Sequence, residues 1–224
     1  MSVGGRQEVE PPKVIYVTGI DGSGKSTVSE HLAARLRDAG YEVDILWLRF
    51  NHVISKPLLA LCRLLGLTRY ESHGGIRVGY HDFYRSRTIS WLFIFFQYLD
   101  AVRVRYFRLQ PRIGRTGRVV ILDRYVYDIL IDIMVDTRIK DLHKGRVGRA
   151  FRALIPEGTL SLLVDRDLGQ VLEVRPEGRL DENFVRRYEF YKELALDPCI
   201  NTVRNDASLE VLLDKVERHA GIIK

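Results

Sequence analysis

One segment near the start of this chain constrains the fold more than any other feature. The run Gly19-Ile20-Asp21-Gly22-Ser23-Gly24-Lys25-Ser26 matches the pattern G-x-x-x-x-G-K-[ST] without a mismatch. A β-branched and aromatic run, 14–17, precedes it, and apolar residues at helical spacing, 28–36, follow it. A glycine-rich turn between a buried strand and a helix surrounds phosphates with backbone N–H groups, and the helix N-terminus adds partial positive charge. The sequence therefore predicts a site for a nucleoside triphosphate.

The expected ATP ligands lie along this loop. Lys25 is expected to hold the β- and γ-phosphates during catalysis, and Ser26 offers its hydroxyl to Mg²⁺. The loop residues that we expect to contact ATP are Gly19, Asp21, Gly22, Ser23, Gly24, Lys25, Ser26 and Thr27. The alternative is a glycine-rich turn with a chance lysine, and the complete match in the right context disfavours it.

Four further apolar runs of strand length follow the loop. They occupy 43–48, 119–122, 160–164 and 200–203. Because helical or mixed segments separate them, the pattern predicts an α/β fold with a five-stranded parallel sheet and helices on both faces. The chain has 224 residues, so we expect a flexible N-terminal tail, 1–12, and one domain over 13–224.

A long insertion, about 50–117, separates the second and third strand runs. Two segments within it, 58–65 and 80–107, are helical in pattern. The second segment carries a stripe formed by Trp91, Phe95, Tyr98 and Val102. Such a stripe is ordinary core or a subunit contact, and a lipid-binding face is the weaker alternative. A homodimer formed through the insertion is therefore one expectation.

A carboxylate and a guanidinium follow the third strand run, at Asp123 and Arg124. Open α/β sheets bind ligands at the carboxyl ends of their strands, so both side chains are expected beside the phosphate loop. Asp123 can organise Mg²⁺ directly or through water, and Arg124 can stabilise the charge of a transferring phosphoryl group. A strand-end salt bridge is the alternative. The chain lacks the Asn-Lys-x-Asp segment that reads guanine, which disfavours a signalling GTPase.

Composition sets the remaining expectations. Lys and Arg exceed Asp and Glu, giving a net charge of +6 that suits an anionic partner. The two cysteines show no metal-binding or disulfide spacing, which favours a reducing, cytoplasmic location. Apolar runs are too short to span a bilayer, so no membrane partner is expected. A basic run over 140–152 lacks interleaved aromatic residues, and we expect no nucleic-acid partner.

The motifs resemble those of the thymidylate kinase family. The loop carries the family's acidic residue at Asp21, Arg49 is similar to its acceptor-phosphate arginine, and Asp123-Arg124-Tyr125 resembles its DR[YFH] signature. The resemblance implies a P-loop kinase fold with a helical insertion and a lid. It also implies an ATP-dependent, Mg²⁺-requiring enzyme that phosphorylates a nucleoside monophosphate, with dTMP as the first acceptor to test.

Further residues are assigned through the resemblance. Phe83 would stack on the acceptor's pyrimidine and Arg87 would read its edge, although core packing is an alternative for Phe83. Asp206 and Ala207 follow the last strand run, where the family packs backbone against adenine. The acceptor-binding residues implied in this way are Asp21, Arg49, Phe83, Arg87 and Arg124.

A polar, arginine-bearing segment over about 168–187 is expected to form the lid. The family places its catalytic arginine either in the P-loop or in the lid, and the P-loop positions here carry Gly22 and Ser23. The chain therefore resembles the lid-arginine type, with Arg175 or Arg179 closing over the phosphates. Arg186 and Arg187 are possible helpers, and solvated surface arginines are the alternative.

Two aspartates depart from the family pattern. Asp128 and Asp132 stand where the family has a serine and an aromatic gate, and Phe50-Asn51-His52 replaces a Pro-Gly-Gly. The two carboxylates are expected to leave the sugar region open and negatively charged, where they would read a hydroxyl, an amine or a cationic acceptor. A solvated helix face is the alternative. The acceptor thus stays open between dTMP and another small molecule, and an ATP-binding regulatory or nucleic-acid-associated protein is the distant alternative.

Overall fold

A computed structural model describes residues 11–49, 52–73 and 76–222. Most of the predicted tail, 1–12, lies outside these residues, as do Phe50 and Asn51 at the start of the predicted insertion.

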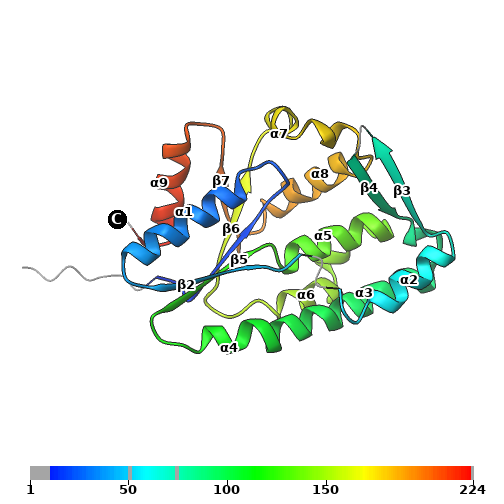
Figure 1. Ribbon diagram of the computed structural model, residues 1–224, viewed down its shortest axis with the longest axis horizontal. Helices are drawn as coiled ribbons and strands as arrows, with labels where there is room; N and C mark the ends of the chain where they lie inside the picture. The colour runs from blue at the N-terminus through cyan, green and yellow to red at the C-terminus, as the bar shows by residue number, and fades with distance from the viewer. Residues whose placement is uncertain (1–10, 50–51, 74–75, 223–224) are drawn as a thin grey trace, which may run out of the picture.

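All five predicted strands are present in one parallel sheet (Figure 1). The strands are β1 (Val14–Thr18), β2 (Glu42–Trp47), β5 (Arg118–Asp123), β6 (Leu160–Asp165) and β7 (Asn201–Arg204). Their order is β2-β5-β1-β6-β7, so β1 is central and every one of its residues is buried. Because neighbouring strands are parallel, their carboxyl ends lie at the same edge of the sheet.

Helices cover both faces of the sheet, as predicted. The side chains of β1 alternate, with Ile15 and Val17 facing α1 (Lys25–Asp38) and α9 (Leu209–His219). Tyr16 faces the opposite way, into the larger core formed with α5 (Val126–Thr137) and the insertion. The remaining helices after the insertion are α6 (Arg146–Arg152), α7 (Leu168–Val174) and α8 (Phe184–Leu194). The α/β class and its two-sided helical cover are confirmed.

The insertion contains a β-hairpin that was not predicted; it lies between the two predicted helical segments and overlaps the second of them, 80–107, only at residues 80 and 81. Its elements are α2 (Lys56–Leu64), β3 (Thr68–His73), β4 (Ile76–His81), a 3₁₀ turn (Phe83–Arg85), α3 (Arg87–Arg103), a π-helical turn (Val104–Leu109) and α4 (Gln110–Ile113). The antiparallel pairing joins Thr68 with His81 and Tyr70 with Gly79. Tyr80 therefore belongs to a strand. Two short runs that contain β-branched and aromatic residues, close together in sequence, are typical of a hairpin.

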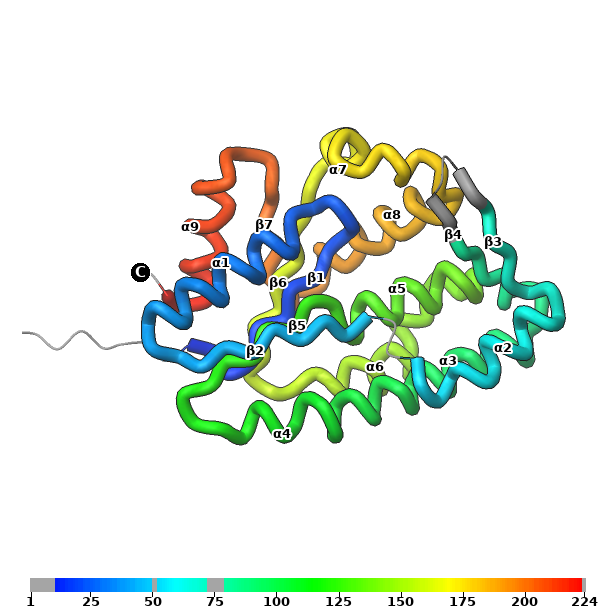
Figure 2. Tube along the Cα trace, viewed as in Figure 1, coloured from blue at the N-terminus to red at the C-terminus, as the bar shows by residue number. Residues whose placement is uncertain are grey.

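The hairpin lies beside the lid region, as Figure 2 shows. Tyr80 Oη donates a hydrogen bond to the Leu180 carbonyl at 3.3 Å, and Arg69 Nη2 donates to Glu182 Oε2 at 2.8 Å. Segments about 100 residues apart in sequence thus meet over one end of α5.

Half of the predicted stripe on α3 packs as core: Tyr98 and Val102 pack against the larger core cluster, whereas Trp91 and Phe95 do not. Trp91 and Phe95 are 46% and 53% exposed, whereas Phe93 and Ile94 are buried. The first two side chains instead border a shallow apolar hollow against α6. None of the helices in the described segments is long and apolar enough to cross a membrane.

Candidate active site

Three glycines give the phosphate loop its shape. Gly19, Gly22 and Gly24 have φ angles of 141°, 89° and 105°, a region that side-chain-bearing residues rarely adopt. The loop ends at the N-terminus of α1, where Lys25 is buried and its Nζ donates a hydrogen bond to the Ile20 carbonyl at 2.6 Å. The predicted strand, loop and helix are therefore contiguous, and the lysine ammonium lies inside the loop.

Lys25 has an unusual electrostatic environment. Burial, reinforced by the nearby Arg124 guanidinium, lowers the pKa of Lys25 to about 7. The carboxylate of Asp21, 3.9 Å from the Lys25 ammonium, opposes this effect. Phosphate anions placed against the loop would favour the charged form of Lys25. The lysine is thus poised to gain full charge when a polyphosphate binds.

A cavity of about 400 Å³ opens beside the loop, and we name it the P-loop cavity. It is lined by Asp21, Gly22, Gly24, Lys25, Ser26, Thr27, Trp47, Asp123, Arg124, Arg166, Val174, Arg175, Asn205, Leu209 and Leu212. Most predicted ATP ligands, together with the predicted catalytic residues Asp123, Arg124 and Arg175, therefore converge on one space. Asp206 and Ala207 do not line this cavity, although the preceding residue, Asn205, does.

Asp123 and Ser26 fit a divalent cation. Asp123 Oδ1 is buried and has no hydrogen-bond partner among the described residues, and both side chains line the P-loop cavity. Burial raises the pKa of Asp123, with Arg124 and Lys25 acting against that shift. A hard cation bound by carboxylate and hydroxyl oxygens would satisfy the orphaned oxygen and favour its charged form.

Two residues of this cavity, Arg166 and Asn205, were missed by the sequence analysis. Arg166 Nη1 donates to the Gly22 carbonyl at 3.2 Å, and Asn205 Nδ2 donates to the Ser23 carbonyl at 2.8 Å. Each follows the last residue of a strand, β6 or β7, just as Arg124 follows β5. The rule that ligand-binding side chains follow the carboxyl ends of parallel strands could have identified both.

The lid approaches the loop through Arg175. A Cβ at Gly22 would lie 2.9 Å from Arg175 Cγ, so the arginine stem rests directly on the loop backbone. Arg175 Nη1 also donates to Glu177 Oε1 at 3.1 Å. The other predicted lid arginine, Arg179, is exposed and lines neither this cavity nor the second cavity described below. Of the two arginines, Arg175 is the one that lines the P-loop cavity.

A chain of ion pairs leads away from the P-loop. Arg124 donates to Asp21 Oδ1, and Arg49 Nη1 donates to Asp21 Oδ2 at 3.2 Å. Arg49 also donates to both oxygens of Asp132, from Nε at 3.0 Å and from Nη2 at 2.9 Å. Arg187 Nε then donates to Asp132 Oδ1 at 3.3 Å. Two carboxylates thus hold three arginines in a row.

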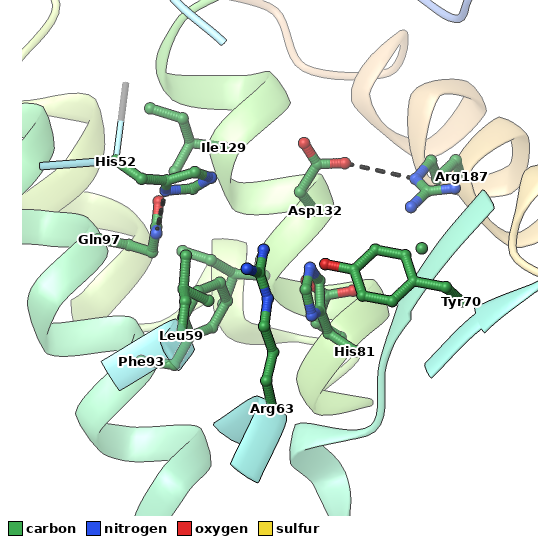
Figure 3. A pocket seen from close by; sticks show the side chains of 13 residues that line it. His52, Leu59, Arg63, Tyr70, His81, Phe93, Gln97, Ile129, Asp132 and Arg187 are labelled. Atoms are coloured by element: carbon green, nitrogen blue, oxygen red, sulfur yellow. Dashed lines mark hydrogen bonds and ion pairs between the residues drawn. The ribbon is translucent and has the colours of Figure 1, made fainter. Parts of the chain in front are cut away.

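The row ends at a second cavity of about 280 Å³ between α5, α8 and the insertion (Figure 3). It is lined by His52, Leu59, Arg63, Tyr70, Gly79, His81, Phe93, Gln97, Ile129, Asp132, Ile133, Asp136 and Arg187. Figure 3 shows Asp132 and Arg187 pointing toward each other on one side, with His81 and Tyr70 of the hairpin nearby. The lining combines aromatic, apolar and hydrogen-bonding groups, as small-molecule sites do.

The titratable groups of the second cavity differ sharply in their preferred charge. Burial lowers the pKa of His52, and it lowers the pKa of His81 to about 4, so both imidazoles are neutral. Burial and the nearby Asp132 carboxylate raise the pKa of Asp136 well above its usual range. Asp132 is largely removed from solvent, which raises the pKa of its carboxyl, but Arg49 and Arg187 prevail and hold that pKa below the usual value. Asp132 is therefore the anion of this cavity.

The predicted base-stacking role of Phe83 is wrong. Phe83 is 0% exposed and packs in the core, with its ring centroid 5.0 Å from that of His81 and 4.6 Å from that of Phe93. Core burial of its large apolar area prevails, and His81 and Phe93 line the cavity in its place. Arg87 begins α3 in an exposed position and lines neither cavity.

The expectations for Asp128 are also wrong. Its carboxylate accepts hydrogen bonds from Tyr16 Oη at 2.8 Å, Tyr191 Oη at 2.7 Å and Thr18 Oγ1 at 3.0 Å. The Tyr125 backbone N–H donates a further bond at 3.1 Å. Asp128 is fully buried and fully occupied, so it lies on no solvated face and offers no free acceptor to a ligand.

The expected open, negatively charged sugar region is not formed either. Asp132 lines the second cavity, but it is paired with Arg49 and Arg187. Tertiary contacts with β2's end and α8 supply these partners, which the sequence spacing does not reveal.

One comparison with known proteins bears on this site. A family model described as adenylylsulphate kinase matches residues 11–52, which comprise β1, the P-loop, α1 and β2. The match covers 42 of the 224 residues. No curated protein sequence matches the chain. Together with the sheet order and the loop, the match supports a P-loop kinase fold, and the matched segment is similar to the nucleotide-binding part of a phosphotransferase family.

Proposed function

We propose that this protein is an ATP- and Mg²⁺-dependent kinase that phosphorylates a small acceptor held in the second cavity. The observation that carries the proposal is the row of ion pairs from Arg124 through Asp21 and Arg49 to Asp132, which joins the P-loop cavity to the second cavity. Two binding spaces connected by positioned charges suit phosphoryl transfer, which needs alignment and electrostatic stabilisation more than covalent participation.

On the ATP side, the chain's own cations act on the triphosphate. Lys25 lies within the loop, Arg124 at the end of β5, and Arg175 above Gly22, so positive charge approaches from three elements. Asp123 and Ser26 would hold Mg²⁺, which would neutralise phosphate charge when bound. Arg166 and Asn205 hold the carbonyls of Gly22 and Ser23 and keep the loop's N–H groups directed at the ligand.

On the acceptor side, the resemblance to thymidylate kinases favours a nucleoside monophosphate, with dTMP first. The volume and mixed lining of the second cavity suit an acceptor of about nucleoside size. One specific observation favours another small acceptor instead. Arg49, the arginine that the resemblance assigns to the acceptor phosphate, is already paired with Asp132.

An acceptor panel tests the proposal. Purified protein with ATP and Mg²⁺ is supplied with monophosphates, nucleosides, sugars, DNA or RNA, and ADP release is followed. Stimulation by a small acceptor, with a phosphorylated product identified by mass, supports the kinase. Stimulation by DNA or RNA alone would replace it with a nucleic-acid-associated ATPase, and Lys25→Ala shows that the measured turnover belongs to this site.

A further inference from the structure

We propose that the acceptor presents an uncharged hydroxyl group, not a phosphate, to ATP, and that Asp132 makes this selection. The inference rests on the proposed kinase function and narrows its substrate class to a small alcohol of about nucleoside or sugar size.

The first observation is that the donors of Arg49 are directed at carboxylates. Nε and Nη2 form a bidentate pair with Asp132 at 3.0 and 2.9 Å, and Nη1 donates to Asp21 at 3.2 Å. Planar phosphate recognition by arginine uses the same forked donor edge. A phosphate could bind the forked Nε/Nη2 edge of Arg49 only by displacing the Asp132 carboxylate, so this carboxylate occupies the place that a bidentate acceptor phosphate would need.

The second observation is that Arg187 is neutralised in the same way. Its Nε donates to Asp132 Oδ1 at 3.3 Å, and its Nη1 donates to Asp181 Oδ2 at 2.7 Å. Asp132 is therefore held from two sides, by the segment after β2 and by α8. With 18% of its side chain exposed, it still faces the second cavity (Figure 3). An anion entering here would have to compete with the Asp132 carboxylate for the two guanidinium groups.

The third observation concerns the rest of the lining. His52 and His81 are neutral, because burial lowers both pKa values, and the buried Asp136 favours its neutral acid form. Arg63 is exposed, and its guanidinium lies 5.7 Å from the centroid of the Tyr70 ring. These groups offer hydrogen bonds and ring contacts to an uncharged molecule. A dianion would need buried arginines, and Arg49 and Arg187 are already paired with carboxylates.

Asp132 Oδ2 is suited to accept a hydrogen bond from a hydroxyl group of the acceptor. Oδ1 accepts bonds from both Arg49 and Arg187, whereas Oδ2 accepts one from Arg49, which leaves acceptor capacity on Oδ2. In the step, the acceptor oxygen forms a bond to the γ-phosphorus of ATP as the bond from that phosphorus to the β,γ-bridging oxygen breaks. ADP leaves with the electron pair, and the hydroxyl proton passes to Oδ2 and then to water.

A phosphate titration tests the selection without knowledge of the acceptor. Protein saturated with ADP and Mg²⁺, so that the P-loop cavity is filled, is titrated calorimetrically with inorganic phosphate. Asp132→Asn should bind phosphate about tenfold or more tightly than the wild type, because Arg49 and Arg187 lose their competing anion. Asp181→Asn is the matched control: it removes the other carboxylate from Arg187 and should leave phosphate binding weak.

The double variant Asp132→Asn/Arg49→Gln should lose the gained binding. Equal phosphate affinity in the wild type and in Asp132→Asn, with both proteins folded by circular dichroism, would overturn the inference. A gain that survives Arg49→Gln would place the phosphate elsewhere and would overturn it as well.

Turnover of matched pairs separates this inference from the proposed function. Thymidine is compared with dTMP, and uridine with UMP, since each pair differs only in the phosphate. Each nucleoside should exceed its monophosphate by about tenfold or more in kcat/KM, and Asp132→Asn should reverse the order. Faster turnover of the monophosphates would overturn the inference and leave the kinase standing. If no nucleoside, sugar or monophosphate raises ADP release, the kinase proposal itself fails.

Discussion

The two cavities are both rich in charge, but they hold it in different ways. In the P-loop cavity, six residues of the short segment 21–27 and a few strand ends supply most of the polar groups, and Asp123 Oδ1 has no partner among the described residues. In the second cavity, Arg49, Asp132 and Arg187 come from distant parts of the chain and satisfy one another. The ATP side is thus prepared for a highly charged ligand, whereas the acceptor side is internally neutralised.

Removing the central cation of the P-loop should have the largest effect. Lys25→Ala deletes a buried ammonium that lies inside the phosphate loop, 2.6 Å from the Ile20 carbonyl. We expect turnover to fall by about 10³-fold or more, since several kcal/mol of charge stabilisation in a water-excluded site is lost. ADP release under saturating ATP measures the effect. Lys13→Ala, an exposed lysine before β1, is the control and should retain activity.

The second prediction concerns a buried carboxylate, Asp128, that pairs with Arg124. Asp128 accepts hydrogen bonds from Tyr16, Thr18 and Tyr191 and pairs with Arg124. Asp128→Ala leaves these buried donors unpaired and should lower the free energy of unfolding by about 3–5 kcal/mol, as for a broken buried ion pair. Urea unfolding measures it.

An exposed aspartate provides the matched control for that experiment. Asp141→Ala removes a pair with Lys144 at 2.9 Å, and it should change stability by less than about 1 kcal/mol. If Asp128→Ala unfolds during purification, Asp128→Asn supplies the measurement. A stability loss no larger than that of Asp141→Ala would show that Asp128 does not anchor this region.

The third prediction asks whether a change at the second cavity alters acceptor binding without altering ATP binding. Arg49→Ala leaves Asp132 with Arg187 as its remaining partner among the ion pairs described here. Asp132 would then be held less firmly in the second cavity, and acceptor binding should weaken. The acceptor KM should rise by several-fold to a few hundred-fold, corresponding to about 1.5–3 kcal/mol for a charge-assisted contact. ATP affinity should barely change. Steady-state kinetics with each substrate varied in turn give both values.

Arg87→Ala is the control for Arg49, because Arg87 is exposed and lines neither cavity. A collapse of ATP binding in Arg49→Ala, with acceptor binding unchanged, would assign Arg49 to the ATP side. An acceptor KM that rises in Arg87→Ala instead would restore the role that the thymidylate kinase resemblance gave to that residue.

Sequence reasoning succeeded where function depends on local order. The strand, glycine turn and helix around Lys25 are contiguous, and Asp123 with Arg124 follows a strand whose carboxyl end must lie beside β1. Those relations follow from sequence adjacency and from the geometry of a parallel sheet. Arg166 and Asn205 obey the same rule, so they were predictable as well.

The acceptor side was less predictable, because its structure depends on long-range contacts. The partners of Asp128 include Tyr16, 112 positions away, and Tyr191, 63 positions away. Burial of Phe83 likewise depends on how the hairpin folds back onto α3. Helical or strand periodicity gives the face of a residue but not the partner that tertiary packing brings to it.

The smallest expected effect is a pH dependence confined to the ATP side. Burial first, and Arg124 second, lower the pKa of Lys25 to about 7 in the free protein, and bound phosphates would raise it. Below pH 7, Lys25 is already charged in the free protein, so few protons are taken up when ATP binds. Above pH 7, Lys25 is mainly neutral, so ATP binding requires Lys25 to take up a proton from solution. ATP affinity should therefore fall between pH 7.5 and 9, by at most about tenfold per pH unit.

The matched variant for this titration is Lys25→Arg, whose guanidinium stays charged throughout the range. Comparing Kd for ATP with excess Mg²⁺ in the two proteins cancels the titration of ATP itself. The wild-type slope should exceed that of the variant, and calorimetry at pH 8 in buffers of different ionisation enthalpy should show net proton uptake. Equal slopes for ATP in wild type and variant would mean that Lys25 is fully charged before the nucleotide arrives.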